Sequence, residues 1–222
     1  MDRNREAGGD FAAAAQKDGA RAQSCRCASD STGVPRRIFL RGMLAGGLAA
    51  STAQPGIADD TKPGDDERPQ PGDVFVFFEG ERQGKIVALA DLKRSAAPAL
   101  VWPMDPKSKV VRSGSRLNQV VLLALDPASL DSNTRSAAPD GVIAYSAICT
   151  HAGCTVTGWV KDQGTQVLKC PCHNSEYDPR RGATVVFGPA PRHLAMLPVS
   201  IDNGALVVAK SFIGKVGPST SA

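Results

Sequence analysis

The chain has 222 residues, enough for one compact domain with tails. Its 26 Lys and Arg against 22 Asp and Glu give a net charge of +4, too even a balance to neutralise a row of phosphates, which excludes a nucleic-acid binder. The 22 Gly and 16 Pro exclude a helical bundle, and only three His limit any chemistry that needs many imidazoles.

The N-terminal part is expected to be an export signal that does not belong to the fold. Residues 1–35 are polar and lack hydrophobic periodicity, as is typical of a disordered segment. Arg36 and Arg37 then precede an apolar, small-residue run over 42–53, and this order resembles a twin-arginine signal. The alternative is an ordinary amphipathic helix with a basic start.

The apolar run is too short for a permanent membrane anchor. It holds about 12 residues, whereas a membrane-spanning helix needs roughly twenty. Small residues at 51–53 and 56–58 offer two cleavage sites, and an uncleaved tether to the inner membrane stays open. Prolines and acidic residues over 54–72 predict a solvated linker, so the folded domain is expected at 73–222.

The apolar segments beyond Asp73 are short and rich in β-branched residues, which predicts an all-β, small antiparallel sandwich or barrel. Asn203-Gly204 predicts a tight hairpin turn, because both residues tolerate positive φ. Residues 127–139 read as a surface excursion with a short helical turn. The expected strands are 74–78, 85–90, 119–125, 142–147, 155–159, 166–169, 197–201 and 205–210.

Four of the six Cys and two of the three His lie in two short boxes. We name these box one, Cys149-Thr150-His151-Ala152-Gly153-Cys154, and box two, Cys170-Pro171-Cys172-His173-Asn174-Ser175. The 15 residues between them suffice for a hairpin that brings the boxes together. A Cys₂His₂ set fits a structural zinc or a 2Fe-2S cluster. Zinc would leave two thiols unpaired in an exported protein, which favours the cluster.

The two boxes resemble the Rieske iron-sulfur family from Asp73 to the C-terminus. The resemblance implies a Rieske-type fold whose cluster-binding part spans about 145–192. It implies that Cys149 and Cys170 bind one iron and that His151 and His173 bind the other. By the same resemblance, the remaining two box cysteines form a disulfide, Cys154–Cys172.

Further family features follow box two. Ser175 and Tyr177 stand where the family places hydroxyls against cluster sulfur, an arrangement that raises the reduction potential. Gly188-Pro189-Ala190-Pro191 resembles the proline loop that covers the cluster. Two departures are Ala152, where quinol-oxidising members carry a larger apolar residue, and Asn174, which replaces a commoner Gly.

The resemblance implies an electron-transfer subunit of the high-potential, disulfide-containing type. An oxygenase catalytic subunit is excluded, because only His193 remains for a second iron site. We expect a subunit like that of quinol:cytochrome c reductase, on the periplasmic side, with a c-type cytochrome or cytochrome b as partner. The alternatives are the small Rieske subunit of a periplasmic molybdenum oxidase such as arsenite oxidase, docked on its molybdenum subunit, and, remotely, a structural zinc module.

Overall fold

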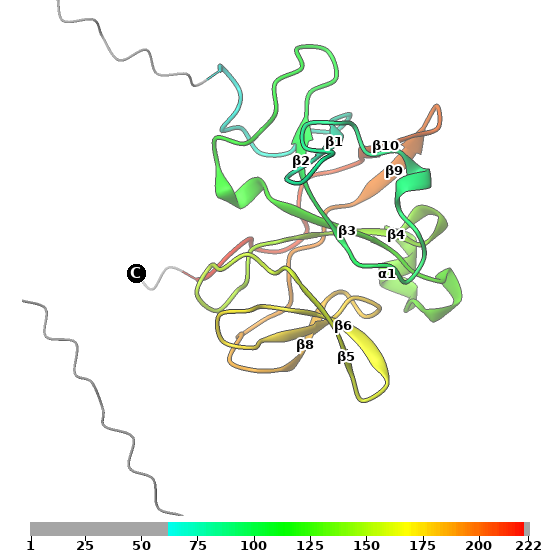
Figure 1. Ribbon diagram of the computed structural model, residues 1–222, viewed down its shortest axis with the longest axis vertical. Coiled ribbons are helices and arrows are strands. Elements are labelled where there is room, and N and C mark those ends of the chain that lie inside the picture. The colour runs from blue at the N-terminus through cyan, green and yellow to red at the C-terminus, as the bar shows by residue number, and fades with distance from the viewer. Residues whose placement is uncertain (1–61, 220–222) are drawn as a thin grey trace, which may run out of the picture. The chain divides into compact units, whose positions relative to one another are not determined.

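The structure is a computed structural model that describes residues 62–219, so the expected export signal at 1–53 lies outside it. Short strands alternate with tight turns (Figure 1). The strands are β1 (Val74–Phe77), β2 (Ala99–Met104), β3 (Val120–Ala124), β4 (Val142–Ser146), β5 (Gly158–Asp162), β6 (Thr165–Lys169), β7 (Glu176–Asp178), β8 (Thr184–Phe187), β9 (Val199–Asp202) and β10 (Ala205–Val208). Helical turns in this range are α1 (Ser132–Ser136), η1 (Leu89–Asp91), η2 (Arg116–Asn118), η3 (Pro127–Ser129) and η4 (Pro139–Gly141). The all-β prediction is confirmed.

The larger sheet has six antiparallel strands in the order β4-β3-β2-β1-β10-β9. Its two edges approach each other through the chain just before β9. The Ser146 N–H donates to the Ala195 carbonyl at 2.8 Å, and the Leu197 N–H donates to the Ala144 carbonyl at 2.9 Å. These bonds cover the edge of β4, so the sheet forms a nearly closed barrel around a core of aliphatic and phenylalanine side chains.

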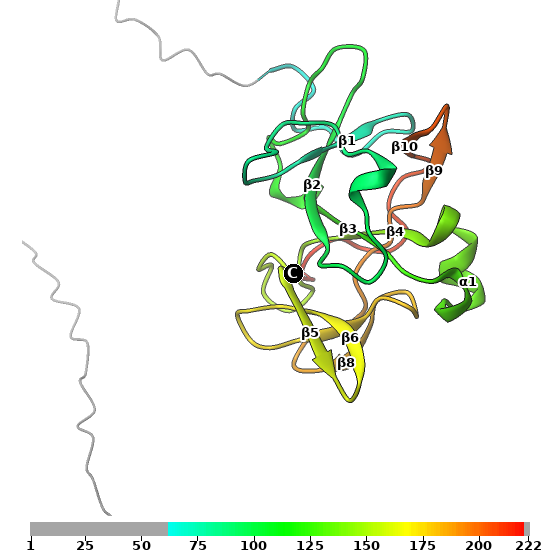
Figure 2. The ribbon, with the colours of Figure 1, turned by 45° about the vertical axis from the view of Figure 1, so that its right-hand side comes forward.

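The smaller sheet has four antiparallel strands in the order β5-β6-β7-β8. Figures 1 and 2 show it grouped on one side of the larger sheet. The two sheets share a buried core, because Tyr145 of β4 lies in one cluster with Leu168 of β6 and Tyr177 of β7. Box one leads from β4 into this sheet, and box two joins β6 to β7. The smaller sheet is therefore the rigid support of both boxes.

The predicted strands agree with the structure except at a few places. The Asn203-Gly204 hairpin is confirmed, with φ of 48° and 80° and Asp202 paired with Ala205. The excursion over 127–139 is also confirmed, since it holds η3, α1 and the start of η4. The strand expected at 155–159 begins later, at Gly158. Strands β2, β7 and β8 were not predicted, because a proline at 103 masks β2 and the others have only 3 and 4 residues.

The strand predicted at 85–90 does not form, which corrects the sequence prediction: residues 85–88 make only isolated bridges, and residues 89 and 90 belong to η1. The Phe77 N–H donates to the Lys85 carbonyl and the Val87 N–H donates to the Phe75 carbonyl, so the segment lies against β1. Ala88 makes a further isolated bridge to Ala205 of β10. Pairing stops there because the chain turns into η1, whose Asp91 carboxylate accepts from the Ala88 N–H at 2.9 Å.

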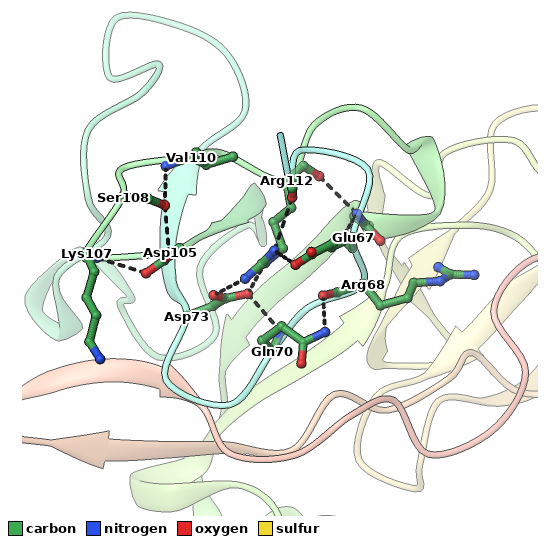
Figure 3. A network of polar contacts seen from close by, with 11 residues as sticks. Glu67, Arg68, Gln70, Asp73, Asp105, Lys107, Ser108, Val110 and Arg112 are labelled. Atoms are coloured by element: carbon green, nitrogen blue, oxygen red, sulfur yellow. Dashed lines mark hydrogen bonds and ion pairs between the residues drawn. The ribbon is translucent and has the colours of Figure 1, made fainter. Parts of the chain in front are cut away.

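The described part of the expected linker, residues 62–72, is bound to the domain (Figure 3). The buried Arg112 guanidinium donates to the Asp73 carboxylate through Nε at 2.5 Å and Nη2 at 3.0 Å. Its Nη1 donates to Glu67 at 2.8 Å and to the Gly64 carbonyl at 3.1 Å. The buried Asn118 amide donates to the Glu67 carbonyl at 2.7 Å. The acidic composition of this segment therefore serves a buried arginine as well as solvation.

No helix among residues 62–219 is long and apolar enough to cross a membrane.

Candidate metal centre

The two boxes fold into loops with the same backbone hydrogen bonds. In box one the Cys149 N–H donates to the Cys154 carbonyl at 2.8 Å, and the Gly153 N–H donates to the Cys149 carbonyl at 3.1 Å. In box two the same two bonds join residues 170 with 175 and 174 with 170, at 2.8 and 3.1 Å. Each loop thus holds its first cysteine and its histidine in equivalent places.

The matched geometry explains why Asn174 stands where a glycine is commoner. The fifth position of each loop has positive φ, 76° at Gly153 and 58° at Asn174. Asn is among the few residues that enter this left-handed region at low cost. The departure noted in the sequence therefore keeps the backbone of the loop.

The four box cysteines divide into a disulfide and two thiols. Cys154 and Cys172 are joined, with their Cα atoms 6.5 Å apart. Cys149 and Cys170 are free and buried, each 1% exposed. The Sγ of Cys170 lies within 4.8 Å of both disulfide sulfurs. The disulfide sulfurs carry no thiolate, so Cys149 and Cys170 are the sulfur donors that remain for a metal.

The two box histidines lie next to each other. Their ring centroids are 4.6 Å apart and the rings meet edge to face. His151 is partly buried, and its Nδ1 has no hydrogen-bond partner among the described residues. His173 is exposed. A buried nitrogen without a partner is costly, so this imidazole is well suited to be a metal ligand, and the Cys₂His₂ donor set fits a 2Fe-2S cluster.

The hydroxyl of Tyr177 lies directly against one of the two buried cysteines. It is fully buried in β7, and its Oη lies 3.1 Å from the Cys149 Sγ. The Thr150 N–H donates to the same Oη at 3.4 Å. When Cys149 is a thiolate it has no hydrogen to give, so the tyrosine hydroxyl is then the donor of the Oη–Sγ bond. Burial raises the pKa of Tyr177 above its ordinary value. The tyrosine therefore stays protonated and remains a donor.

Burial acts in the same way on the thiol of Cys170. It raises the pKa of Cys170 above its ordinary value, because the thiolate loses hydration. A buried thiol of this kind needs a bound cation to ionise, since a coordinating thiol is deprotonated outright.

Ser175 and the expected covering loop meet directly. The Ala190 N–H donates to the Ser175 Oγ at 3.2 Å, which leaves the serine hydrogen available as a donor. Gly188 has φ of 89°, and a Cβ there would lie 2.6 Å from the Ser175 Cα. The loop over 188–191 can approach box two this closely only with glycine at its first position.

Residues 118–198 match the Rieske [2Fe-2S] domain family. The chain carries a Rieske domain. A Rieske domain binds one 2Fe-2S cluster, and the buried sulfur donors described above agree with that cofactor.

The matching relatives cover this domain and not whole proteins. A Rieske subunit named for respiratory nitrate reductase, from Haloferax mediterranei, is 47% identical over 79 residues, which is 35% of this chain and 34% of the relative. A cytochrome bc1 complex Rieske iron-sulfur subunit from Streptomyces lividans is 37% identical over 102 residues, 45% of this chain and 59% of that protein. The same subunit from Corynebacterium diphtheriae is 48% identical over 77 residues, which is 34% of this chain and 18% of the relative. The chain thus spans less than two thirds of these relatives.

Solved Rieske structures also match. The soluble domain of Rieske protein II from Sulfolobus acidocaldarius gives a TM-score of 0.33 at 23% identity, covering 45% of this chain and 69% of that one. The plasma-membrane Rieske protein of Synechocystis gives 0.36 at 25% identity, covering 55% and 95%.

The structure brings all the predicted site residues of the Rieske domain into one region. It adds Arg192, which the sequence did not indicate. The Thr150 Oγ1 donates to the Arg192 carbonyl at 2.6 Å, which ties box one to the end of the covering loop. The Arg192 guanidinium in turn donates to the Gly217 carbonyl. The sequence held no signal for these contacts, because the partners are 42 and 25 positions apart.

Proposed function

We propose that this chain is an exported electron-transfer protein of the high-potential Rieske type. When bound, the 2Fe-2S cluster supplies reversible uptake of one electron. The observation that carries the proposal is the pair of buried thiols and neighbouring imidazoles on two matched loops. In this proposal Cys149 and Cys170 bind one iron, and His151 and His173 bind the other.

In this proposal the other residues of the centre tune the cluster, hold the two loops together or contact the redox partner. Tyr177 donates its hydroxyl hydrogen toward Cys149, and Ser175 has a hydroxyl hydrogen to donate to cluster sulfur. Both donors stabilise the extra negative charge of the reduced state, so they raise the reduction potential. The disulfide Cys154–Cys172 holds the two loops together. The exposed His173 provides the edge through which a redox partner approaches.

The proposed place of this protein is as the iron-sulfur subunit of a quinol:cytochrome c reductase. The relatives named as cytochrome bc1 subunits support this role. A second candidate is the Rieske subunit of another exported oxidoreductase, because a relative of 47% identity over 79 residues is named for respiratory nitrate reductase. The small subunit of a molybdenum oxidase, the alternative from the sequence, belongs to this second candidate.

A redox titration followed by electron paramagnetic resonance tests the proposal. We expect a nitrogen-ligated 2Fe-2S signal and a potential near the upper end of the Rieske range of roughly −150 to +300 mV. Cys149→Ser and His173→Ala should each abolish the signal. His193→Ala, which removes the exposed third histidine, should keep it. A colourless protein with bound zinc would overturn the assignment.

Export is tested on the full chain in cells. We expect the protein outside the cytoplasm, and replacement of Arg36 and Arg37 by Lys should keep it inside. Equal fractionation of the two forms would contradict a twin-arginine route.

A further inference from the structure

A groove with basic sides runs from box one toward the C-terminal segment. Two adjoining hollows, of about 580 and about 260 Å³, share Leu117 and Pro218 in their linings. Ala152 lies at the end of the smaller hollow, and Arg68 and Lys215 line the larger one. We call these two hollows together the basic groove.

The C-terminal segment forms one wall of the basic groove. A Cβ on Gly153 would lie 3.5 Å from the Pro218 Cδ, so the segment packs against box one. The Arg192 guanidinium holds the Gly217 carbonyl in place. Figures 1 and 2 both show the last described residues, in red, beside the loop that follows β4. The groove is therefore built on the same contacts that hold the cluster loop.

The charged residues that line the basic groove are Arg68, Arg116 and Lys215, and no Asp or Glu lines it. Arg68 donates to the Leu117 carbonyl at 3.1 Å, and Arg116 donates to the Gly153 carbonyl at 3.2 Å. Within residues 62–219 no carboxylate pairs with any of the three. Figure 3 shows Arg68 extending away from the ion pairs around Arg112.

We propose that an acidic redox protein docks on the basic groove. Guanidinium groups held by neutral carbonyls keep further N–H donors for a partner's carboxylates. The apolar lining, which includes Leu117, Phe212 and Val216, gives the contact a part that excludes water. The groove ends at Ala152, beside the proposed ligand His151, so a protein seated there lies near the electron. This position favours a redox partner over an anionic lipid surface. The inference rests on the function proposed above.

Stopped-flow electron transfer into the oxidised, cluster-loaded full chain tests the proposal, with a reduced acidic plant-type ferredoxin as the probe. We expect a second-order rate constant that falls as salt rises. Arg116→Gln combined with Lys215→Gln should lower this constant about tenfold at low salt and weaken its salt dependence. Lys215→Gln alone, which alters no hydrogen bond to box one, should give a smaller change in the same direction.

Lys161→Gln is the matched control, because it removes one exposed charge from the β5–β6 hairpin, and Lys161 does not line the groove. With basic cytochrome c as electron acceptor, electron transfer from the reduced double variant should be no slower than from the unmodified protein. General damage to the protein would slow both this reaction and the transfer from ferredoxin.

An unchanged ferredoxin rate in the double variant would overturn the docking proposal. Binding to phosphatidylglycerol vesicles that the double variant abolishes, with the ferredoxin rate unchanged, would assign the groove to a membrane.

The outcome for the groove is separate from the outcome for the cluster. Before each rate measurement, the resonance signal and the potential are recorded for every variant. Absence of the 2Fe-2S resonance signal from the unmodified protein would refute the proposed function itself. A normal signal with variant rates equal to those of the Lys161→Gln control would refute docking alone.

Discussion

Tyr177 shows how single residues prepare this centre. Its hydroxyl is buried, accepts from the Thr150 N–H and lies 3.1 Å from the Cys149 sulfur, to which it donates once that cysteine is a thiolate. A second buried tyrosine, Tyr145, donates instead to the Pro179 carbonyl at 2.9 Å. The two residues have the same chemistry and the same burial, but only one of them touches a proposed iron ligand.

This pair gives a prediction with its own control. Tyr177→Phe removes a hydrogen bond that is stronger in the reduced state. If that difference equals the roughly 1 kcal/mol of an ordinary hydrogen bond, the potential should fall by about 40 mV, given roughly 59 mV per 1.4 kcal/mol for one electron. Tyr145→Phe should lower stability and leave the potential unchanged. Redox titration of both variants measures the difference. A potential in Tyr177→Phe equal to that of the unmodified protein would remove the tuning role.

The elements of the site are loops held at fixed distances by a rigid sheet. Box one, box two and the covering loop meet through backbone contacts, and Gly188 is the point of closest approach. Another glycine, Gly164, has a similar φ of 85° in the turn between β5 and β6, but a Cβ there would meet nothing within 4 Å.

Alanine substitution of these two glycines distinguishes the cost of positive φ, which both share, from the cost of a steric clash, which only Gly188 has. Gly164→Ala should cost about 1 kcal/mol, because alanine must adopt positive φ. Gly188→Ala should cost about 1–3 kcal/mol more through overpacking and should speed loss of the cluster to a chelator. Denaturant unfolding and the decay of the visible spectrum measure the two effects. Equal behaviour of the two variants would show that the contact with Ser175 is unimportant.

The whole molecule depends on contacts that join distant segments. The pair Arg112–Asp73 is buried and links the segment before β1 to the chain after β2 (Figure 3). The neighbouring Glu67 contacts the same arginine, but its side chain is 59% exposed.

Removing the buried acid should matter far more than removing the exposed one. Asp73→Asn leaves the buried Arg112 with only the exposed Glu67 as a charged partner, and we expect a loss of unfolding free energy toward the lower end of about 3–5 kcal/mol. Glu67→Gln should cost less than about 1 kcal/mol, because water screens that pair. Urea unfolding of both variants tests this. Similar losses would mean that the buried pair has no special weight.

The disulfide acts at the same scale, because it closes a loop of sequence separation 18 that contains β5 and β6. Replacing Cys154 and Cys172 by Ala should lower the free energy of unfolding by about 3 kcal/mol by the loop-entropy relation, as measured by urea unfolding.

The barrel core of the larger sheet contains neither box, so on heating the cluster should bleach before the barrel unfolds. Visible absorbance and circular dichroism, followed together, show the order. A single coincident transition would contradict it.

The sequence by itself predicted the class of the fold, which the structure confirms, and the residues of the proposed site. Alternating short apolar runs and the Asn203-Gly204 turn are local signals, so the hairpin and most strands followed from them. The ligand types and spacing of the two boxes indicated a metal centre of two Cys and two His. The disulfide and the 2Fe-2S cofactor followed from the resemblance of the boxes to the Rieske family. Local signals failed where pairing partners decide the structure, as at β2 and at residues 85–90.

Only the tertiary structure decided which contacts join the pieces. The bond from Tyr177 to Cys149, the approach of Gly188 to Ser175 and the ion pair of Arg112 with Asp73 each link residues 13 or more positions apart. Nothing in a local pattern specifies such partners, because they are selected by how the two sheets pack. The same holds for the basic groove, whose residues come from four separate segments and form one surface only where the C-terminal segment packs against box one.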